Sequence, residues 1–267
     1  MVASSSLRGR VPGQLAMSEI VAAQRTTPTR SRLAKFFGAS PLEPRTRPLY
    51  RAALGELLVG DTLDHLGPEW DVLHVVPVDE ERRDIDHLVI GPPGVFTLTT
   101  ENMLGDEVWI GGETMLVDNK RRDDILAAKK LAQTASGLLS TASGRSVNVE
   151  PILVLVNPKR LVLREQPSGL IVVSSKHLLR WLKGLERTLK GEDVANISDV
   201  ADRNSTWQAA ITPLEDTPQL NRDFGKLREE VRRATRVRIA WGILAFAVLC
   251  TIIWVSTVLV VEHLMGH

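Results

Sequence analysis

The sequence predicts an α/β domain, with a mixed β-sheet flanked by helices, followed by one C-terminal transmembrane helix. Two observations carry this prediction. Segments with helical and strand periodicity follow one another in the order helix, strand meander, helix, strand, strand, helix, which is typical of a sheet covered by helices. Near the C-terminus, a long apolar run without charge follows a cluster of basic residues, as in a membrane span.

The regular elements of the domain follow from periodicity and from turn residues. Apolar residues at helical spacing predict helices, alternating or continuous short apolar runs predict strands, and Gly-Pro combinations mark turns. The expected helices are 49–66, 123–141 and a third from Ser174 or Ser175 to 189; the expected strands are 70–76, 83–90, 95–100, 107–110, 115–117, 152–156 and 170–173; short helices are expected at 194–200 and 207–211.

Composition is that of an ordinary globular protein. The chain has 267 residues, of which 43% are apolar and 24% are charged, and this length allows one or two compact domains. The net charge of +1 gives no overall field that would require a nucleic-acid partner. Cys250 is the single cysteine, so an intramolecular disulfide is excluded.

The predicted organisation has four parts. Residues 1–47 are interpreted as a disordered basic tail, because eight basic residues face only Glu19 and Glu43. Such a tail could contact anionic lipid or nucleic acid, or remain solvated without a specific partner. Residues 48–190 form the α/β domain, residues 191–238 a helical extension with a basic juxtamembrane segment, and residues 239–261 the transmembrane helix.

The membrane segment also predicts an orientation. Residues 239–261 carry no charge, and about 34 Å of helix is enough to cross a hydrocarbon core. The positive-inside rule places the preceding basic side in the cytoplasm, against anionic headgroups of the cell membrane. The sequence therefore predicts a single-pass membrane protein with its soluble domain on the cytoplasmic side. The basic residues before the span are Lys226, Arg228, Arg232, Arg233, Arg236 and Arg238.

Acidic residues gather in the expected strand meander. Asp84 and Asp86 are two positions apart on one strand and therefore share a face. A hairpin through the turn at residues 91–94 brings Asp86 close to positions 99–101, which include Glu101. Carboxylates at a strand end are typical ligands of Mg²⁺ in phosphodiester hydrolysis. Acids near turns are also commonly just solvated, so position alone leaves both interpretations open.

The stretch around these acids resembles the nuclease-related domain (NERD) family, which is abundant in bacteria. The resemblance rests on Gly55-Glu56, DIDHLVIGPPGVFTL at 84–98 and VWIGGETMLVDNK at 108–120, and extends from about residue 50 to 182 through PILVLV and SSKHLLRWL. It implies a restriction-endonuclease-like fold. In that fold, a helix Glu, a strand Asp and a following Glu/Asn-x-Lys element form a metal-dependent DNA-cleaving site.

The resemblance holds for two of the three site elements. Glu56 matches the helix Glu and Asp86 the strand Asp, and these two residues could hold Mg²⁺. At the Glu/Asn-x-Lys element the chain has Thr99, Thr100 and Glu101. Thr99 removes a strong metal ligand, and Glu101 places an anion where the family has its cation, so it would repel a scissile phosphate. The site is therefore expected to be degenerate.

Two further polar residues are assigned from their positions. His87 follows Asp86 on the strand and should point to the opposite face, where a packed or hydrogen-bonded structural role is expected. Gln133 lies on the helix expected at 123–141; related folds use a polar residue there, whereas a solvated helix face is the alternative.

Three functions are compatible with these residues. The first is a membrane-tethered pseudo-nuclease that acts as a binding or scaffold module, for which nucleic acid is a candidate ligand. The second is an active nuclease with a rearranged site, in which Lys129 or Lys130 replaces the missing lysine. The third is a structural membrane protein whose cytoplasmic domain binds an unknown protein.

Overall fold

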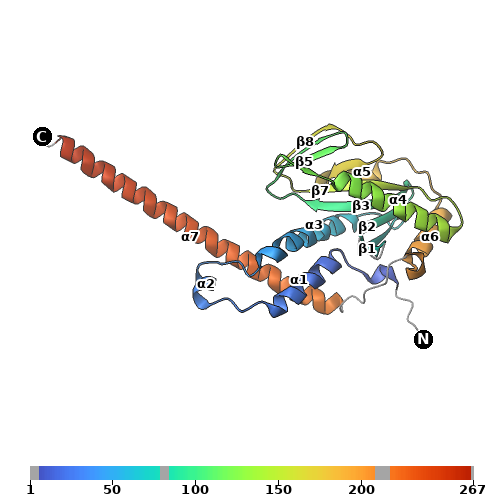
Figure 1. The fold of residues 1–267 in the computed structure, drawn as a ribbon, viewed down its shortest axis with the longest axis horizontal. Helices are drawn as coiled ribbons and strands as arrows, with labels where there is room; N and C mark the ends of the chain where they lie inside the picture. Colours follow the sequence, from blue (N-terminus) through green and yellow to red (C-terminus); the bar gives the residue numbers. More distant parts are fainter. Residues whose placement is uncertain (1–5, 79–83, 208–216, 266–267) are drawn as a thin grey trace. The chain divides into compact units, whose positions relative to one another are not determined.

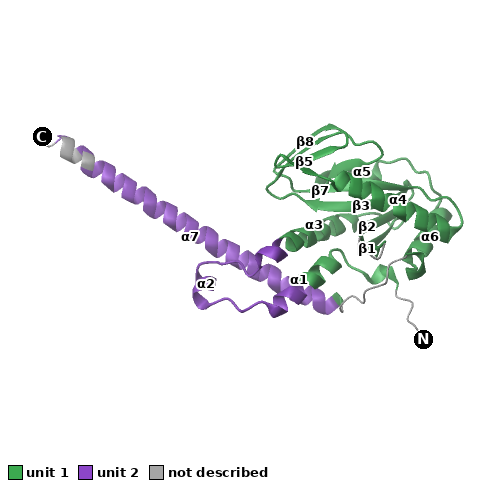
Figure 2. Cartoon of the chain, in the orientation of Figure 1, with its two compact units in different colours: residues 1–20, 48–217 green, residues 21–47, 218–267 purple. Residues whose placement is uncertain are grey.

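A computed structural model describes residues 6–78, 84–207 and 217–265. The chain divides into two compact units (Figure 2). Unit 1 comprises residues 1–20 and 48–217, and unit 2 comprises residues 21–47 and 218–267. The first unit holds the predicted α/β domain and the second holds the long C-terminal helix (Figure 1).

A mixed five-stranded sheet forms the centre of unit 1, as the sequence predicted. Its strand order is β1-β2-β3-β7-β9. The first three strands pair antiparallel, and the last two join them in parallel, so the chain returns to the sheet through long connections. The strands are β1 (Asp71–Pro77), β2 (Asp84–Gly91), β3 (Gly94–Asn102), β7 (Val149–Val156) and β9 (Ile171–Ser174).

Helices cover both faces of this sheet (Figure 1). On one face, buried residues of β1 and β2 pack with α4 (Asp124–Ser143) and α6 (Gly191–Asp202). On the other face, Val59 and Leu63 of α3 (Arg47–Leu63) and Leu178 of α5 (Ser175–Lys183) pack on Phe96 and Leu98. The continuous apolar run of β7 is buried between these layers, which is typical of a central strand.

A second, four-stranded sheet was not expected, although two of its strands were. Its order is β6-β5-β4-β8, and β4 pairs in parallel with β8. Sequence periodicity predicted β4 (Glu107–Gly111) and β5 (Thr114–Val117) but missed β6 (Lys120–Arg122) and β8 (Arg160–Glu165). The two missed strands bury no residue, so they lack the apolar alternation on which strand prediction depends.

The interpretation of residues 1–47 as a disordered tail is wrong for the part that the structure describes. This segment contains α1 (Gln14–Thr26) and the short α2 (Arg32–Phe36). Leu7 and Met17 are each 1% exposed, and Arg8 Nη2 lies 2.9 Å from Asp71 Oδ2. The arginines that suggested disorder therefore form specific contacts, while sparse apolar residues supply the buried anchors.

The C-terminal helix α7 (Thr217–Met265) is longer than the expected membrane segment. It is long and apolar enough to cross a membrane, and the most apolar part of the helix has no buried residue. The expected extension at 191–238 is split, because α6 belongs to unit 1 and residues from 218 onward belong to unit 2. Of the short helix expected at 207–211, all but Trp207 lies outside the described residues, and Trp207 follows the 3-10 turn Asn204–Thr206.

Candidate functional site

Asp86 lies where β2 and β3 separate. The last residues that they pair on this side of the hairpin are His87 and Leu98, while β3 continues alongside β7 as far as Asn102. The Asp86 carboxylate fills the opening and accepts a hydrogen bond from the Thr100 backbone N–H, with an N–Oδ2 distance of 2.6 Å. The hairpin thus brings Asp86 to positions 99–101, as the sequence predicted.

The surroundings of Asp86 show that the predicted carboxylates gather around it. Burial raises the pKa of Asp86 well above its usual value, and the neighbouring charges of Glu56, Glu101 and Asp84 raise it further. The Thr100 N–H acts in the opposite direction, because it stabilises the ionised form. Residues from a helix and two strands therefore share one acidic cluster, defined here as Glu56, Asp84, Asp86 and Glu101.

Glu56 reaches this cluster because Gly55 lets α3 approach the end of β3. A Cβ at Gly55 would lie 3.0 Å from Asn102 Cβ, closer than ordinary packing allows. Burial raises the pKa of Glu56 to about 7, while a hydrogen bond from the Gly13 backbone N–H lowers it and the charges of Asp84 and Glu101 raise it. Gly13 has φ +69°, and its backbone lies against Ala53 of α3.

Glu101 is held by a cation that comes from an unpredicted strand. Arg122 Nη2, on β6, lies 3.2 Å from Glu101 Oε2 and 2.9 Å from Asp124 Oδ1. Burial raises the pKa of Glu101 to about 7; the charge of Asp124 raises it further, and Arg122 lowers it. Arg122 therefore divides its charge between two acids. One of them, Glu101, occupies the position where the resembled family has a lysine.

The three predicted site carboxylates thus have three different partners. Gly13 N–H donates to Glu56, Thr100 N–H donates to Asp86, and Arg122 pairs with Glu101. Within the described parts of the chain, no group of three or more His, Cys, Asp or Glu residues is arranged to hold a metal ion. Glu56 and Asp86 are electrostatic neighbours, but the geometry does not fit a preassembled Mg²⁺ site.

The remaining residues predicted for the site are Thr99, Gln133, Lys129 and Lys130. Thr99 is half-buried and pairs with Leu153 of β7. Gln133 is exposed on α4, and no hydrogen bond links it to the cluster among the described residues. Lys129 Nζ lies 2.6 Å from Glu113 Oε2, and Lys130 is exposed. Neither lysine is therefore placed as the replacement cation that the rearranged site requires.

His87 has the structural role expected of it. It is fully buried, and its Nδ1 lies 2.8 Å from Nδ1 of His74 on the neighbouring strand, so one ring donates and the other accepts. Burial lowers the pKa of His87 and lowers that of His74 to about 4. Both rings are consequently neutral at physiological pH.

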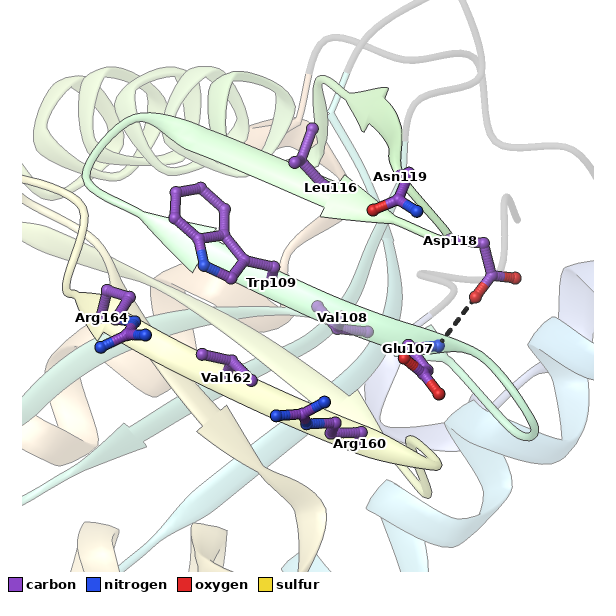
Figure 3. Close-up of a pocket in the computed structure, with 9 residues that line it drawn as sticks. All are labelled: Glu107, Val108, Trp109, Leu116, Asp118, Asn119, Arg160, Val162 and Arg164. Atoms are coloured by element: carbon purple, nitrogen blue, oxygen red, sulfur yellow. Dashed lines mark hydrogen bonds between the residues drawn. The ribbon is translucent and has the colours of Figure 1, made fainter.

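A second candidate site was missed by sequence reasoning. A pocket of about 510 Å³ lies on the second sheet, and its side chains come from β4, β5, β8 and the turn between β5 and β6, which supplies Asp118 and Asn119 (Figure 3). Trp109 lies in the middle, opposite Leu116 on β5 and Val162 on β8. Arg160 and Arg164 flank Val162 on the same strand face (Figure 3).

The pocket presents an aromatic ring beside two arginines and two acids, Glu107 and Asp118, and the charge of Arg160 acts on Glu107. The Trp109 residue is 37% exposed, and its indole lies over Gly111, where a Cβ would come within 2.5 Å of the ring. Neither Arg160 nor Arg164 makes an ion pair with any residue that the structure describes. The available signal in the sequence was the Arg-x-Val-x-Arg alternation from 160 to 164, which β8 places on one face.

Comparison with known proteins assigns the domain. Neither the search of curated proteins nor the search of solved structures gave a match. The family model described as nuclease-related domain (NERD) matches residues 51–156, which contain Glu56, Asp86, Glu101 and Trp109. The match ends at β7, whereas the resemblance was expected to continue to about residue 182. The part of the chain from 51 to 156 is therefore similar to the nuclease-related domain family.

Proposed function

We propose that the protein is a membrane-tethered nuclease-related domain that binds nucleic acid without cleaving it. The observation that carries the proposal is the ion pair of Glu101 with Arg122, at the position where the resembled family has a free lysine. Glu101 puts a negative charge at this position, where a positive charge would stabilise the transition state. Its ion pair also occupies the nearby cation, Arg122. The site therefore retains the shape of a nuclease site but lacks its cationic part.

The other carboxylates support the same conclusion. In-line phosphodiester hydrolysis uses metal ions to activate water and to offset the charge on the phosphate. Glu56 and Asp86 each accept a hydrogen bond from the chain itself, so a metal ion would share these carboxylates with partners already in place. Their raised pKa values also mean that protons compete with a metal ion for the same oxygens.

Two arginines, Arg10 and Arg122, are the candidate cations of an active alternative. Arg10 Nη1 donates to the Val75 carbonyl oxygen, and the charge of Asp84 raises the pKa of Arg10 while burial lowers it. In a rearranged but active site, Arg10 or Arg122 would take the role first assigned to Lys129 or Lys130. Both arginines contact protein groups, which favours the binding function.

The pocket around Trp109 supports nucleic acid as the ligand. A half-exposed indole offers a face on which a base can stack, and stacking of this kind contributes about 1–3 kcal/mol per base. Arg160 and Arg164 provide unpaired guanidinium groups for phosphates. A protein ligand is the remaining alternative, and salt dependence distinguishes the two because phosphate contacts release counterions.

The tether is α7, with the soluble part in the cytoplasm of the cell. Its apolar stretch is exposed along its length, and the six basic residues from Lys226 to Arg238 precede that stretch, which supports the cytoplasmic orientation. Deleting residues 239–267 should move the protein from the membrane fraction to the soluble fraction. Continued sedimentation with membranes would assign the attachment to another segment.

The test of the proposed function is a cleavage and binding assay on the full chain in detergent. We expect retention of labelled single-stranded and duplex DNA and RNA without cleavage in Mg²⁺ or Mn²⁺. Robust cleavage that Asp86→Ala abolishes would overturn the non-hydrolytic assignment, and Arg10→Ala and Arg122→Ala would then identify the cation. Absence of binding to every nucleic acid would favour the protein-binding alternative.

A further inference from the structure

We propose that the segment around α2 is a second membrane-contacting element, which inserts into the lipid interface beside the point where α7 enters the membrane. This inference rests on the proposed membrane tether and concerns unit 2 alone. The partner is the interfacial region of a lipid bilayer, with acyl chains meeting Leu33, Phe36 and Phe37 and headgroups meeting the basic residues nearby. The argument starts from how this segment is fixed to α7.

Aromatic contacts join the end of α2 to α7. The Trp241 indole Nε1 donates a hydrogen bond to the Phe36 carbonyl oxygen at 2.8 Å. The ring centroids of Phe36 and Phe37 lie 5.1 and 5.3 Å from that of Trp241, and 5.2 Å from each other. Three rings therefore form one cluster, in the edge-on and tilted geometries that aromatic groups favour.

Backbone packing fixes the same segment one turn earlier along α7. Gly38 has φ +71°, and a Cβ there would lie 2.6 Å from both Ala234 O and Arg238 N. Such an approach and such a φ are available to glycine and strained for other residues. Arg30 also pairs with Glu230 at 2.8 Å and donates to the Ala39 carbonyl oxygen at 2.7 Å.

These contacts place the segment at the boundary between the charged and apolar parts of α7. Arg236 and Arg238 are the last charged residues before the span, and Trp241 lies directly beyond them. Tryptophan at such a boundary is typical of the membrane–water interface. Because α2 is attached at this level, its side chains lie at the depth of the headgroups when α7 spans the bilayer.

The exposed side of the segment is apolar. Leu33, Phe36 and Phe37 are 70%, 58% and 56% exposed, and their i, i+3, i+4 spacing puts them on one side of the turn. This surface continues into the exposed apolar surface of α7, where Ile239 is 56% exposed. Arg32 and Lys35 alternate with these residues in the sequence, as in interfacial helices that combine apolar insertion with headgroup contact.

Lipid is favoured over a protein partner by continuity and charge. The apolar surface adjoins α7, whose most apolar stretch has no buried residue. A lipid bilayer would therefore cover both apolar surfaces. The flanking residues are basic rather than mixed in sign, which complements an anionic leaflet. A five-residue helix is too short to be stable alone. The attachment of α2 to α7 therefore holds it in the conformation in which it inserts.

The experiment measures membrane depth in the full chain reconstituted into phosphatidylcholine–phosphatidylglycerol vesicles. In a Cys250→Ser background, single cysteines at Leu33, Phe37, Phe246 and Leu104 carry an environment-sensitive fluorophore. Phe246 lies in the span and Leu104, 61% exposed in unit 1, is the aqueous control. Labelling at Leu33 avoids the aromatic cluster, so it remains informative if Phe37→Cys disturbs the cluster.

We expect the probes at Leu33 and Phe37 to be blue-shifted and quenched more by lipids brominated near the headgroup than by deeply brominated lipids. The Phe246 probe should show the opposite preference, and the Leu104 probe should stay in water. If Phe246 is in lipid while Leu33 is in water, this inference is overturned and the tether stands. If Phe246 itself is in water, the tether fails, and this inference fails with it.

Discussion

The acidic cluster and the pocket around Trp109 belong to the same domain, yet their charged side chains are partnered in opposite ways. In the cluster, Glu56, Asp86 and Glu101 are largely buried, and each has a partner within the chain. In the pocket, Arg160 and Arg164 extend from an exposed strand, with no ion pair among the residues that the structure describes. A ligand competes with existing contacts at the first site and meets available groups at the second.

This difference separates the residues that resemble a nuclease site from those of the proposed binding site. The cluster keeps the positions that resemble a nuclease site, but its internal contacts reduce the free energy that a metal or phosphate would gain on binding. Part of the pocket, including Trp109, comes from the stretch 108–120 that resembles the family, and the pocket is the proposed binding site for nucleic acid. The comparison therefore predicts that altering the cluster changes chemistry, whereas altering the pocket changes affinity.

The largest expected effect is a gain of cleavage. Replacing Thr99 with Glu and Glu101 with Lys restores the ligand and the cation of the resembled motif, so metal-dependent nicking of plasmid DNA should rise by about a hundredfold or more above background. Glu101→Gln is the matched control, since it removes the acid without adding a cation. A folded double variant that leaves the plasmid intact would contradict the assignment of these two positions.

The next effect is on affinity at the pocket. Trp109→Ala should weaken binding of a single-stranded oligonucleotide by roughly tenfold, because one stacked base contributes about 1–3 kcal/mol, and Trp109→Phe should retain most of the affinity. Fluorescence anisotropy gives both values. Equal affinities for all three proteins would show that the indole does not contact the ligand.

Charge at the pocket should appear in the salt dependence. Each phosphate contact contributes about 0.7 to the slope of log affinity against log salt for single strands, so Arg160→Gln with Arg164→Gln should lower the slope by about one or more. Arg187→Gln is the control, because Arg187 already pairs with Glu69. An unchanged slope in the double variant would place the phosphates elsewhere on the protein.

The smallest effect concerns stability and pH. Glu56 and Glu101 have pKa values raised to about 7 in the folded chain, so they hold protons that the unfolded chain has already released. The free energy of unfolding should therefore fall as the pH rises from about 4.5 to about 7 and then level off, because above pH 7 the folded chain has released these protons too. The half-buried His74, with its pKa lowered to about 4, acts in the opposite sense up to its unfolded value of about 6.5, so the fall that remains between about pH 6.5 and 7 comes from the carboxylates.

Glu56→Gln tests this reading. The variant stays neutral and can still accept the Gly13 N–H, so it should be more stable than the unmodified protein at about pH 8, by about 1–3 kcal/mol, with a smaller gain in acid. Denaturant titration at several pH values measures the difference. Glu113→Gln is the control, since Lys129 lowers the pKa of Glu113. A pH-independent gain would mean that Glu56 is ionised in the fold.

Sequence reasoning was sufficient where the pattern is local. The strands of the five-stranded sheet were predicted because they carry apolar runs or alternate, and Asp86 was placed near 99–101 because a four-residue turn leaves little freedom. The strand β6 was missed because all its residues are charged, and β8 because its three apolar residues form only a short run between charged ones; neither strand buries a residue. Without those strands, neither the partner of Glu101 nor the pocket could be foreseen.

Sequence spacing does not predict the partners of the acidic cluster. Gly13 is 43 positions before Glu56 and Arg122 is 21 positions after Glu101, and neither residue belongs to the motif that defines the family. The Arg-rich composition of residues 1–47 led to a prediction of disorder, because high charge is typical of disordered segments. The contact of Gly13 with Glu56 was therefore not predicted. Long-range contacts of this kind are set by the assembled fold rather than by local sequence.

The Gly13–Glu56 contact has a consequence for where this domain can be cut. The family match begins at residue 51, but the segment before it supplies the N–H that Glu56 accepts, Pro12 against Gly60 and Leu7 in the core. A protein shortened to begin at residue 48 would leave a buried carboxylate without its donor and an opening where Leu7 packs. The evolutionary boundary of the domain is therefore not its folding boundary, and an excised fragment would give a false picture of the intact site.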